Sequence, residues 1–105
     1  MLTPSPQSPD ERGKHWLQAK VQQILAASAV ALATPAPEDN PACYWGTNLE
    51  TGTTLYLRLA GDPEPQALRF NRALLRDCGG GWYTRQDYAT MFIRRTLKKM
   101  GILSA

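Results

Sequence analysis

Histidine and cysteine are both scarce in this chain. Its 105 residues contain one histidine, His15, and two cysteines, Cys43 and Cys78. A metal site with several histidines, an all-cysteine zinc site and a disulfide framework are therefore excluded. We expect both cysteines to be buried, reduced thiols, as is usual in the cytoplasm. Neither thiol has a local activating signature, so the sequence predicts no enzyme activity. It also predicts no cofactor and no bound metal.

Long apolar runs are also missing. The longest mostly apolar stretch, Ile24 to Ala33, is far shorter than the roughly 20 residues that a membrane-spanning helix needs. The first residues have neither the basic segment nor the apolar core of a secretory signal. We therefore expect a cytoplasmic protein that has no membrane partner.

Length and composition indicate one domain. The hydrophobic content of 43% argues against disorder, and 105 residues supply one modest core. We expect residues 1–8, rich in proline and serine, to be a flexible tail in front of a single domain at 9–105. The bias toward alanine, proline and arginine is compatible with a GC-rich bacterial or phage genome.

The first half of the chain predicts a helix and a hairpin. An apolar stripe with helical spacing indicates a helix at 9–33. Residues 34–41 contain three prolines and form the predicted linker. Two runs with strand character flank a turn, which predicts a hairpin at 42–60, and the alternation places Leu55 and Leu57 on its core face.

The second half predicts two further helices. Asp62, followed by a proline, has the residue type of an N-cap and indicates a helix at 62–78. Thr84 as N-cap and Gly101 just past the end indicate a second helix at 84–100. The predicted fold class is therefore α+β, with a long N-terminal helix, an antiparallel β-hairpin and two C-terminal helices in a helix-turn-helix-like arrangement.

The segment between these two helices leaves one alternative open. Trp82 and Tyr83 are either a short third strand, which would make the sheet three-stranded, or a loop. The predicted turn, residues 79–84, is longer than the 3–4 residues usual in a helix-turn-helix.

The segment from Tyr83 to Leu103, which ends Leu-Lys-Lys-Met-Gly-Ile-Leu, resembles the recognition helix of a winged-helix or helix-turn-helix domain. The resemblance covers about a fifth of the chain. It implies that Arg85 and Gln86, near the start of the helix, meet bases, while Lys98 and Lys99 meet phosphates.

Charge is unevenly distributed along the chain. Residues 1–65 carry four cations and seven anions, whereas residues 66–105 carry eight cations and two anions, a net charge of +6. Six of those eight cations are arginines, which suit bidentate recognition of phosphate. The helix at 84–100 gathers four cations on one face, and like charges one turn apart repel each other there. They are Arg94, Arg95, Lys98 and Lys99.

The charge pattern predicts a small nucleic-acid-binding or regulatory protein, with DNA favoured over RNA. Arg85 and Tyr88 are the expected base contacts, and the full predicted set is Arg85, Tyr88, Arg94, Arg95, Lys98, Lys99, Arg69, Arg72 and Arg76. Two alternatives stay open. The helix face is either simply solvated, its cations favoured by the helix dipole, or it docks on an acidic protein, the chain then being an inhibitor or a subunit.

The predicted first helix is apolar nearly all round from Ile24 onward, which indicates burial on several sides. A second copy of the chain would supply part of that burial. The predicted partner or homodimer interface therefore consists of Leu17, Val21, Ile24, Leu25 and Leu32.

Three aromatic residues of the hairpin have two interpretations. Tyr44, Trp45 and Tyr56 either cover the second face of the sheet against a helix, which we favour, or stack on bases or a protein partner.

Overall fold

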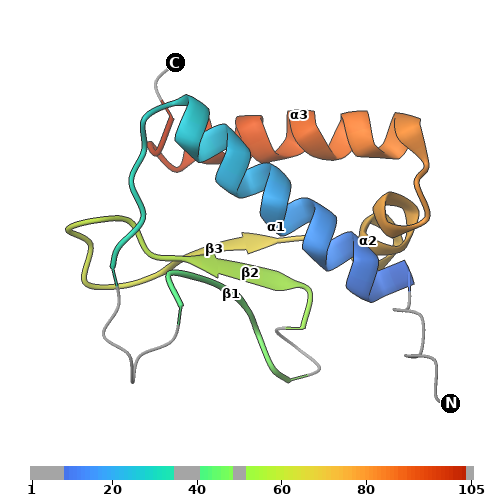
Figure 1. The fold of residues 1–105 in the computed structure, drawn as a ribbon, viewed down its shortest axis with the longest axis horizontal. Coiled ribbons are helices and arrows are strands. Elements are labelled where there is room, and N and C mark those ends of the chain that lie inside the picture. The colour runs from blue at the N-terminus through green and yellow to red at the C-terminus, as the bar shows by residue number, and fades with distance from the viewer. Residues whose placement is uncertain (1–8, 35–40, 49–51, 104–105) are drawn as a thin grey trace, which may run out of the picture.

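The computed structural model of the chain describes residues 9–34, 41–48 and 52–103. The helices and strands follow the order α1 (Pro9–Ala27), β1 (Cys43–Trp45), β2 (Thr54–Leu57), β3 (Gln66–Arg69), α2 (Arg72–Gly79) and α3 (Tyr83–Lys99). Figure 1 shows the three helices gathered on one side of the sheet. The α+β class is confirmed. The predicted tail, most of the linker and part of the hairpin turn lie outside the described residues.

The first helix is shorter than predicted, because α1 ends at Ala27 and not at residue 33. Ala29 adopts a left-handed backbone with φ 58°, and the amide of Val30 donates to the carbonyl of Leu25 over 2.9 Å. This is the backbone geometry that glycine usually supplies at a helix end. Because alanine stands there, the sequence carried no stop signal. The chain then runs beside the sheet, where Leu32 forms a bridge with Leu59.

The sheet is antiparallel and three-stranded, in the order β1-β2-β3. Its register pairs Trp45 with Leu55, and Leu55 with Leu68, so these residues lie on the face toward the helices. Leu55, Leu57 and Leu68 have no exposed surface. The hairpin and the leucine face predicted from alternation are both confirmed.

The predicted helix at 62–78 is wrong in its first half. Residues 66–69 form β3, and α2 begins only at Arg72. Asn71 is the N-cap, since its side-chain oxygen accepts a hydrogen bond from the amide of Leu74 over 2.7 Å. Asp62 therefore caps no helix, and pairing with β2 outweighs the helical spacing of the apolar residues in this segment.

Three residues join α2 to α3, so the predicted long turn and the optional strand at Trp82 and Tyr83 are both wrong. Trp82 is the N-cap residue of α3 without a side-chain cap, and Tyr83 is its first helical residue. The predicted cap Thr84 lies inside the helix. Gly101, with φ 78°, ends α3 as predicted, and Ile102 donates to the carbonyl of Leu97 over 2.9 Å.

Glycines allow α1 and α2 to cross at very close range. A Cβ on Gly13 would lie 1.8 Å from the carbonyl oxygen of Leu75. A Cβ on Gly79 would lie 1.8 Å from the carbonyl oxygen of Pro9. Neither side of this crossing therefore tolerates any other residue without moving the helices apart.

Candidate nucleic-acid interface

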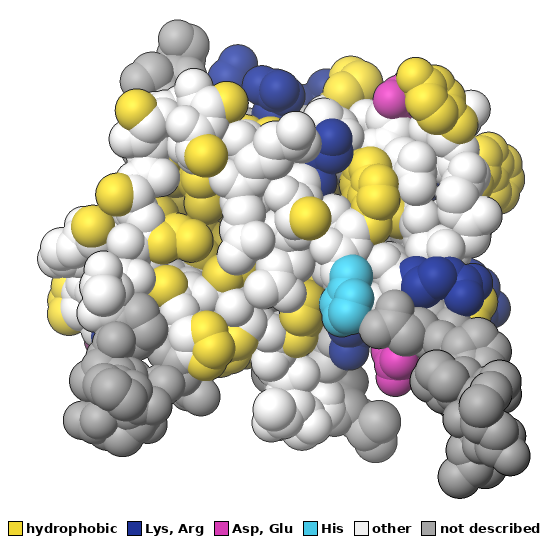
Figure 2. Space-filling model, in the orientation of Figure 1, with side chains coloured by type: hydrophobic (Ala, Val, Ile, Leu, Met, Phe, Trp, Pro, Cys, Tyr) yellow, Lys and Arg dark blue, Asp and Glu magenta, His cyan; other side chains and the backbone are white. Residues whose placement is uncertain are grey.

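The C-terminal half of α3 carries the densest group of cations in the described structure. We call Arg94, Arg95, Lys98 and Lys99 the α3 cluster. All four are exposed, and none forms an ion pair within the part of the chain that the structure describes. In Figure 2, dark blue side chains gather along the upper edge of the molecule, over this half of α3.

The opposite face of α3 explains why these cations point outward. Ala89, Ile93 and Leu97 recur every four residues, and each is 0% exposed. Phe92 and Met100 pack against the same core. Burial of this apolar face leaves the α3 cluster toward solvent.

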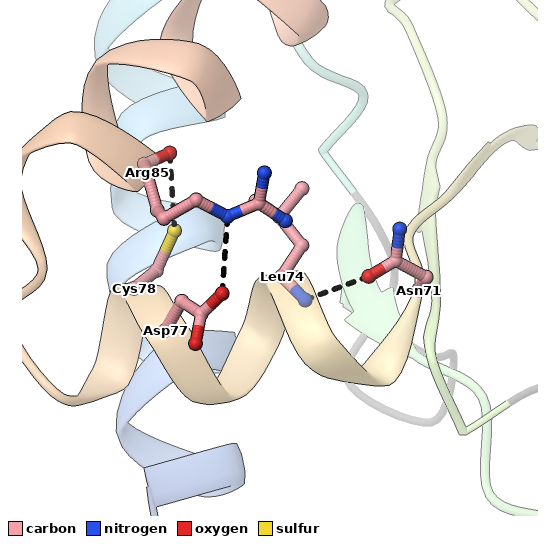
Figure 3. Close-up of polar contacts among 5 residues, drawn as sticks. All are labelled: Asn71, Leu74, Asp77, Cys78 and Arg85. Atoms are coloured by element: carbon pink, nitrogen blue, oxygen red, sulfur yellow. Dashed lines mark hydrogen bonds and ion pairs between the residues drawn. The ribbon is translucent and has the colours of Figure 1, made fainter.

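Arg85, the predicted base contact, is held between α3 and α2. Its Nε lies 3.0 Å from Oδ2 of Asp77, and both side chains are mostly buried, with exposures of 31% and 25% (Figure 3). The carbonyl oxygen of Arg85 accepts a bond from the thiol of Cys78 over 3.8 Å. Gln86 donates to the carbonyl of Cys78 over 2.9 Å. The start of α3 is therefore fastened to the end of α2.

Tyr88, the second predicted base contact, is half exposed but already has ring partners. The guanidinium carbon of Arg85 lies 5.1 Å from the centroid of the Tyr88 ring. The Phe92 ring stacks on Tyr88 with centroids 6.5 Å apart. The contacts join Asp77, Arg85, Tyr88 and Phe92 into one chain across the α2–α3 corner.

The predicted stripe of Arg69, Arg72 and Arg76 does not exist as a helical stripe. Arg69 lies on β3, because the segment before residue 72 is a strand. Arg72 and Arg76 lie on α2, with their Nε atoms 3.9 and 3.7 Å from the two carboxylate oxygens of Asp10 on α1. The acidic N-terminal region thus partly compensates these two arginines, at distances too long for hydrogen bonds.

The two groups of cations also lie at different ends of the helical layer. Asp77 and Cys78 of α2 contact α3 near Arg85, and Arg94 follows nine residues later, about 14 Å further along the axis. Arg72 and Arg76 lie beside Asp10 in the first turn of α1, and Figure 1 shows this end of α1 on the far side of the helical layer from the C-terminal half of α3. The candidate interface is therefore the α3 cluster alone.

The residues predicted for a partner or homodimer interface lie in the core of the single chain. Leu17 and Val21 are 0% exposed, Ile24 is 2% and Leu25 is 1% exposed. Leu32 is half-buried at its bridge with Leu59. The prediction is wrong for these four residues of α1, because the rest of the chain already buries them. They leave no surface for a second copy.

Both cysteines are free and buried, as predicted. Burial raises the pKa of the Cys43 thiol to about 11, against a smaller opposite effect of its hydrogen bond with Gln18. Burial also raises the pKa of Cys78 to about 11, with Arg85 lowering it and Asp77 raising it further. A thiol used as a nucleophile has its pKa lowered, so the shifts run in the opposite direction.

The three hairpin aromatics divide between the two faces of the sheet. Trp45 lies on the helix side, where its indole donates to Gln18 over 3.1 Å and its ring lies 5.8 Å from that of Phe70. Tyr44 and Tyr56 stack on each other on the opposite side. The favoured interpretation, a helix covering all three, is therefore wrong for the two tyrosines.

A surface cavity of about 710 Å³ lies between α1, α2 and the loops next to β1 and β2. Asp10, Lys14 and Arg72 line it, so its walls carry both signs of charge. It lies on the α2 side of the molecule and contributes nothing to the α3 cluster. Among the described residues there is no group of three or more His, Cys, Asp or Glu that could hold a metal ion.

None of the described helices is both long and apolar enough to cross a membrane. Comparison with protein-family models, with curated proteins and with solved structures gave no match to this chain.

Proposed function

We propose that this chain is a small non-enzymatic nucleic-acid-binding protein of the cytoplasm, which engages the phosphates of DNA through the α3 cluster. The main support for the proposal is that the cations of the α3 cluster are exposed and form no ion pair within the described residues. Four exposed cations occupy two turns of one helix, and within the described residues no acid pairs with any of them. By contrast, Arg72 and Arg76 lie beside Asp10, and Arg85 lies beside Asp77.

The arrangement suits a row of phosphates. Arg94 and Arg95 precede Lys98 and Lys99 by one turn, which separates the two pairs by about 6 Å along the axis. Such pairs repel each other, so a bound anion gains energy by neutralising both. Arginine adds bidentate contacts to phosphate oxygens.

The test is titration of labelled duplex DNA at several salt concentrations. We expect the wild-type affinity to fall with salt, with a log–log slope of about −0.9 for each phosphate neutralised. The variant Arg94→Gln/Arg95→Gln/Lys98→Gln/Lys99→Gln replaces each cation with a neutral polar side chain, and we expect a much shallower slope.

The matched control is Arg72→Gln/Arg76→Gln, which removes two arginines that lie beside Asp10. We expect this control to keep most of the wild-type slope. Absence of DNA binding at low salt, or equal slopes in the fourfold variant and the wild type, would overturn the proposal.

A second candidate function is docking on an acidic protein, and the exposed apolar side chains before and along the first half of α3 favour it. Trp82, Tyr83, Tyr88 and Met91 are between 50% and 75% exposed on or next to α3. Aromatic residues, methionine and arginine are the types enriched at protein interfaces. Binding of polyglutamate in preference to DNA of equal charge concentration, lost in Met91→Ser, would select this function.

A further inference from the structure

The second face of the sheet is a surface that the α3 cluster does not use. The helices lie on the face that carries Trp45, Leu55 and Leu68 (Figure 1). Because side chains alternate along a strand, Tyr44, Tyr56 and Ala67 point to the other side. We call that side the outer sheet face, and no described helix covers it.

One row across the outer sheet face is incomplete. Tyr44, Tyr56 and Ala67 are direct partners on β1, β2 and β3. The two tyrosine rings stack, with centroids 5.3 Å apart and planes at 21°. On its other flank the direct partner of Tyr56 is Ala67, a small and exposed residue. Neighbouring strands lie about 4.8 Å apart, so the row has an open position of one ring's width above Ala67.

Two arginines stand at the ends of this open position. Arg69 follows Ala67 by two residues on β3 and therefore shares its face. Arg58 comes directly after β2, where its amide donates to the carbonyl of Ala42 over 2.8 Å and continues the pairing with the β1 side, so it shares the face of Tyr56. Because β2 and β3 are antiparallel, the two arginines lie on opposite sides of the row. Neither forms an ion pair among the residues that the structure describes.

We infer that the outer sheet face binds single-stranded nucleic acid, with one unpaired base stacked on Tyr56 above Ala67 and the flanking phosphates at Arg58 and Arg69. A planar base continues the tyrosine stack, and its strand carries the negative charges that two unpaired arginines attract. In a duplex the bases are paired and stacked on one another, so their faces are not available. The inference goes beyond the proposed function, since it concerns another surface and another form of nucleic acid.

The test compares a labelled single-stranded oligonucleotide with an abasic oligonucleotide of equal length, by fluorescence anisotropy at low salt. Both probes carry the same phosphates, so charge alone binds them equally. If a base stacks on Tyr56, the wild type binds the probe with bases about tenfold more tightly.

Three variants locate that preference. Ala67→Ile fills the open position with a residue that favours strands, so the fold is kept and we expect the tenfold preference to disappear. Tyr56→Phe retains the ring and the preference, whereas Tyr56→Leu loses it. The matched control is Ala19→Leu, an exposed alanine of α1 that also gains bulk. We expect Ala19→Leu to behave as the wild type.

The inference is overturned if the wild type binds both probes equally, or if Ala67→Ile, folded by circular dichroism, keeps the preference. Its failure is distinguishable from failure of the proposed function. Loss of duplex binding in the fourfold α3 variant together with a preserved base preference separates the two surfaces. A base preference that the α3 variant abolishes would instead place the base on α3 and overturn the inference.

Discussion

The two halves of α3 differ in the surroundings of their positively charged side chains. In the first half, Arg85 lies against Asp77 of α2 and beneath the ring of Tyr88, mostly out of solvent. In the second half, the four members of the α3 cluster extend into solvent with no acid beside them in the described structure. The same residue type therefore fastens the fold at one end and offers a surface at the other. What separates the roles is the neighbouring element, because α2 reaches only the start of α3.

The strongest way to break the fastened region is to separate α1 from α2. In Gly13→Ala the new methyl group meets the carbonyl of Leu75 at 1.8 Å, a backbone contact that cannot rotate away. We expect a loss of about 3 to 5 kcal/mol in the free energy of unfolding, measured by urea denaturation. Gln22→Ala on the exposed side of α1 is the control, with an expected change within about 0.5 kcal/mol. A Gly13→Ala variant as stable as this control would refute the close crossing.

Removing one arginine from each half of α3 tests whether the two halves contribute differently to stability. Arg85→Ala leaves the partly buried Asp77 without its partner, and we expect a loss of about 1.5 kcal/mol. Arg95→Ala removes an exposed side chain of the same type from the same helix, so we expect a change within about 0.5 kcal/mol. Equal effects of the two substitutions on the unfolding midpoint would show that the halves do not differ.

The ends of α1 and α3 allow a smaller and opposite effect. Both end with a residue in the left-handed conformation, which is Ala29 at φ 58° after α1 and Gly101 at φ 78° after α3. Alanine is strained at such an angle, so we expect Ala29→Gly to stabilise the chain by about 0.5 to 1 kcal/mol. Thermal unfolding followed by circular dichroism measures it, and a lower midpoint in Ala29→Gly would contradict the geometry of that turn.

The smallest effect concerns repulsion within the α3 cluster. Arg94 and Arg95 precede Lys98 and Lys99 by four residues, and like charges at that spacing cost a few tenths of a kcal/mol. We expect Arg94→Gln/Arg95→Gln to raise stability by about 0.3 kcal/mol at low salt, with no gain at high salt. A loss of stability at low salt would mean that the cluster has a structural partner.

Much of the fold follows from local patterns. The alternation in 54–57 identified β2 and its core face, and the glycine after Met100 identified the end of α3. These signals are local because one residue or one period determines each of them. The α3 cluster was also visible in the sequence, since the helical period that buries Ile93 and Leu97 turns the cations outward.

The wrong predictions concern residues whose structure depends on contacts with distant parts of the chain. Residues 66–69 have an apolar spacing compatible with a helix, yet they pair with β2. Arg72 and Arg76 were predicted to bind phosphates, but in the structure they lie beside Asp10 of α1. The apolar stripe of α1 was predicted to be an interface, but it is buried in the core of the single chain.

The sequence by itself determined which residues are apolar, where cations accumulate and how the last helix faces. The tertiary structure decided which cations form ion pairs, and it placed Ala67 next to the two stacked tyrosines of the outer sheet face. The physical reason is range: helix and strand periods act between residues a few positions apart, whereas ion pairs and cross-strand neighbours join residues far apart in the chain.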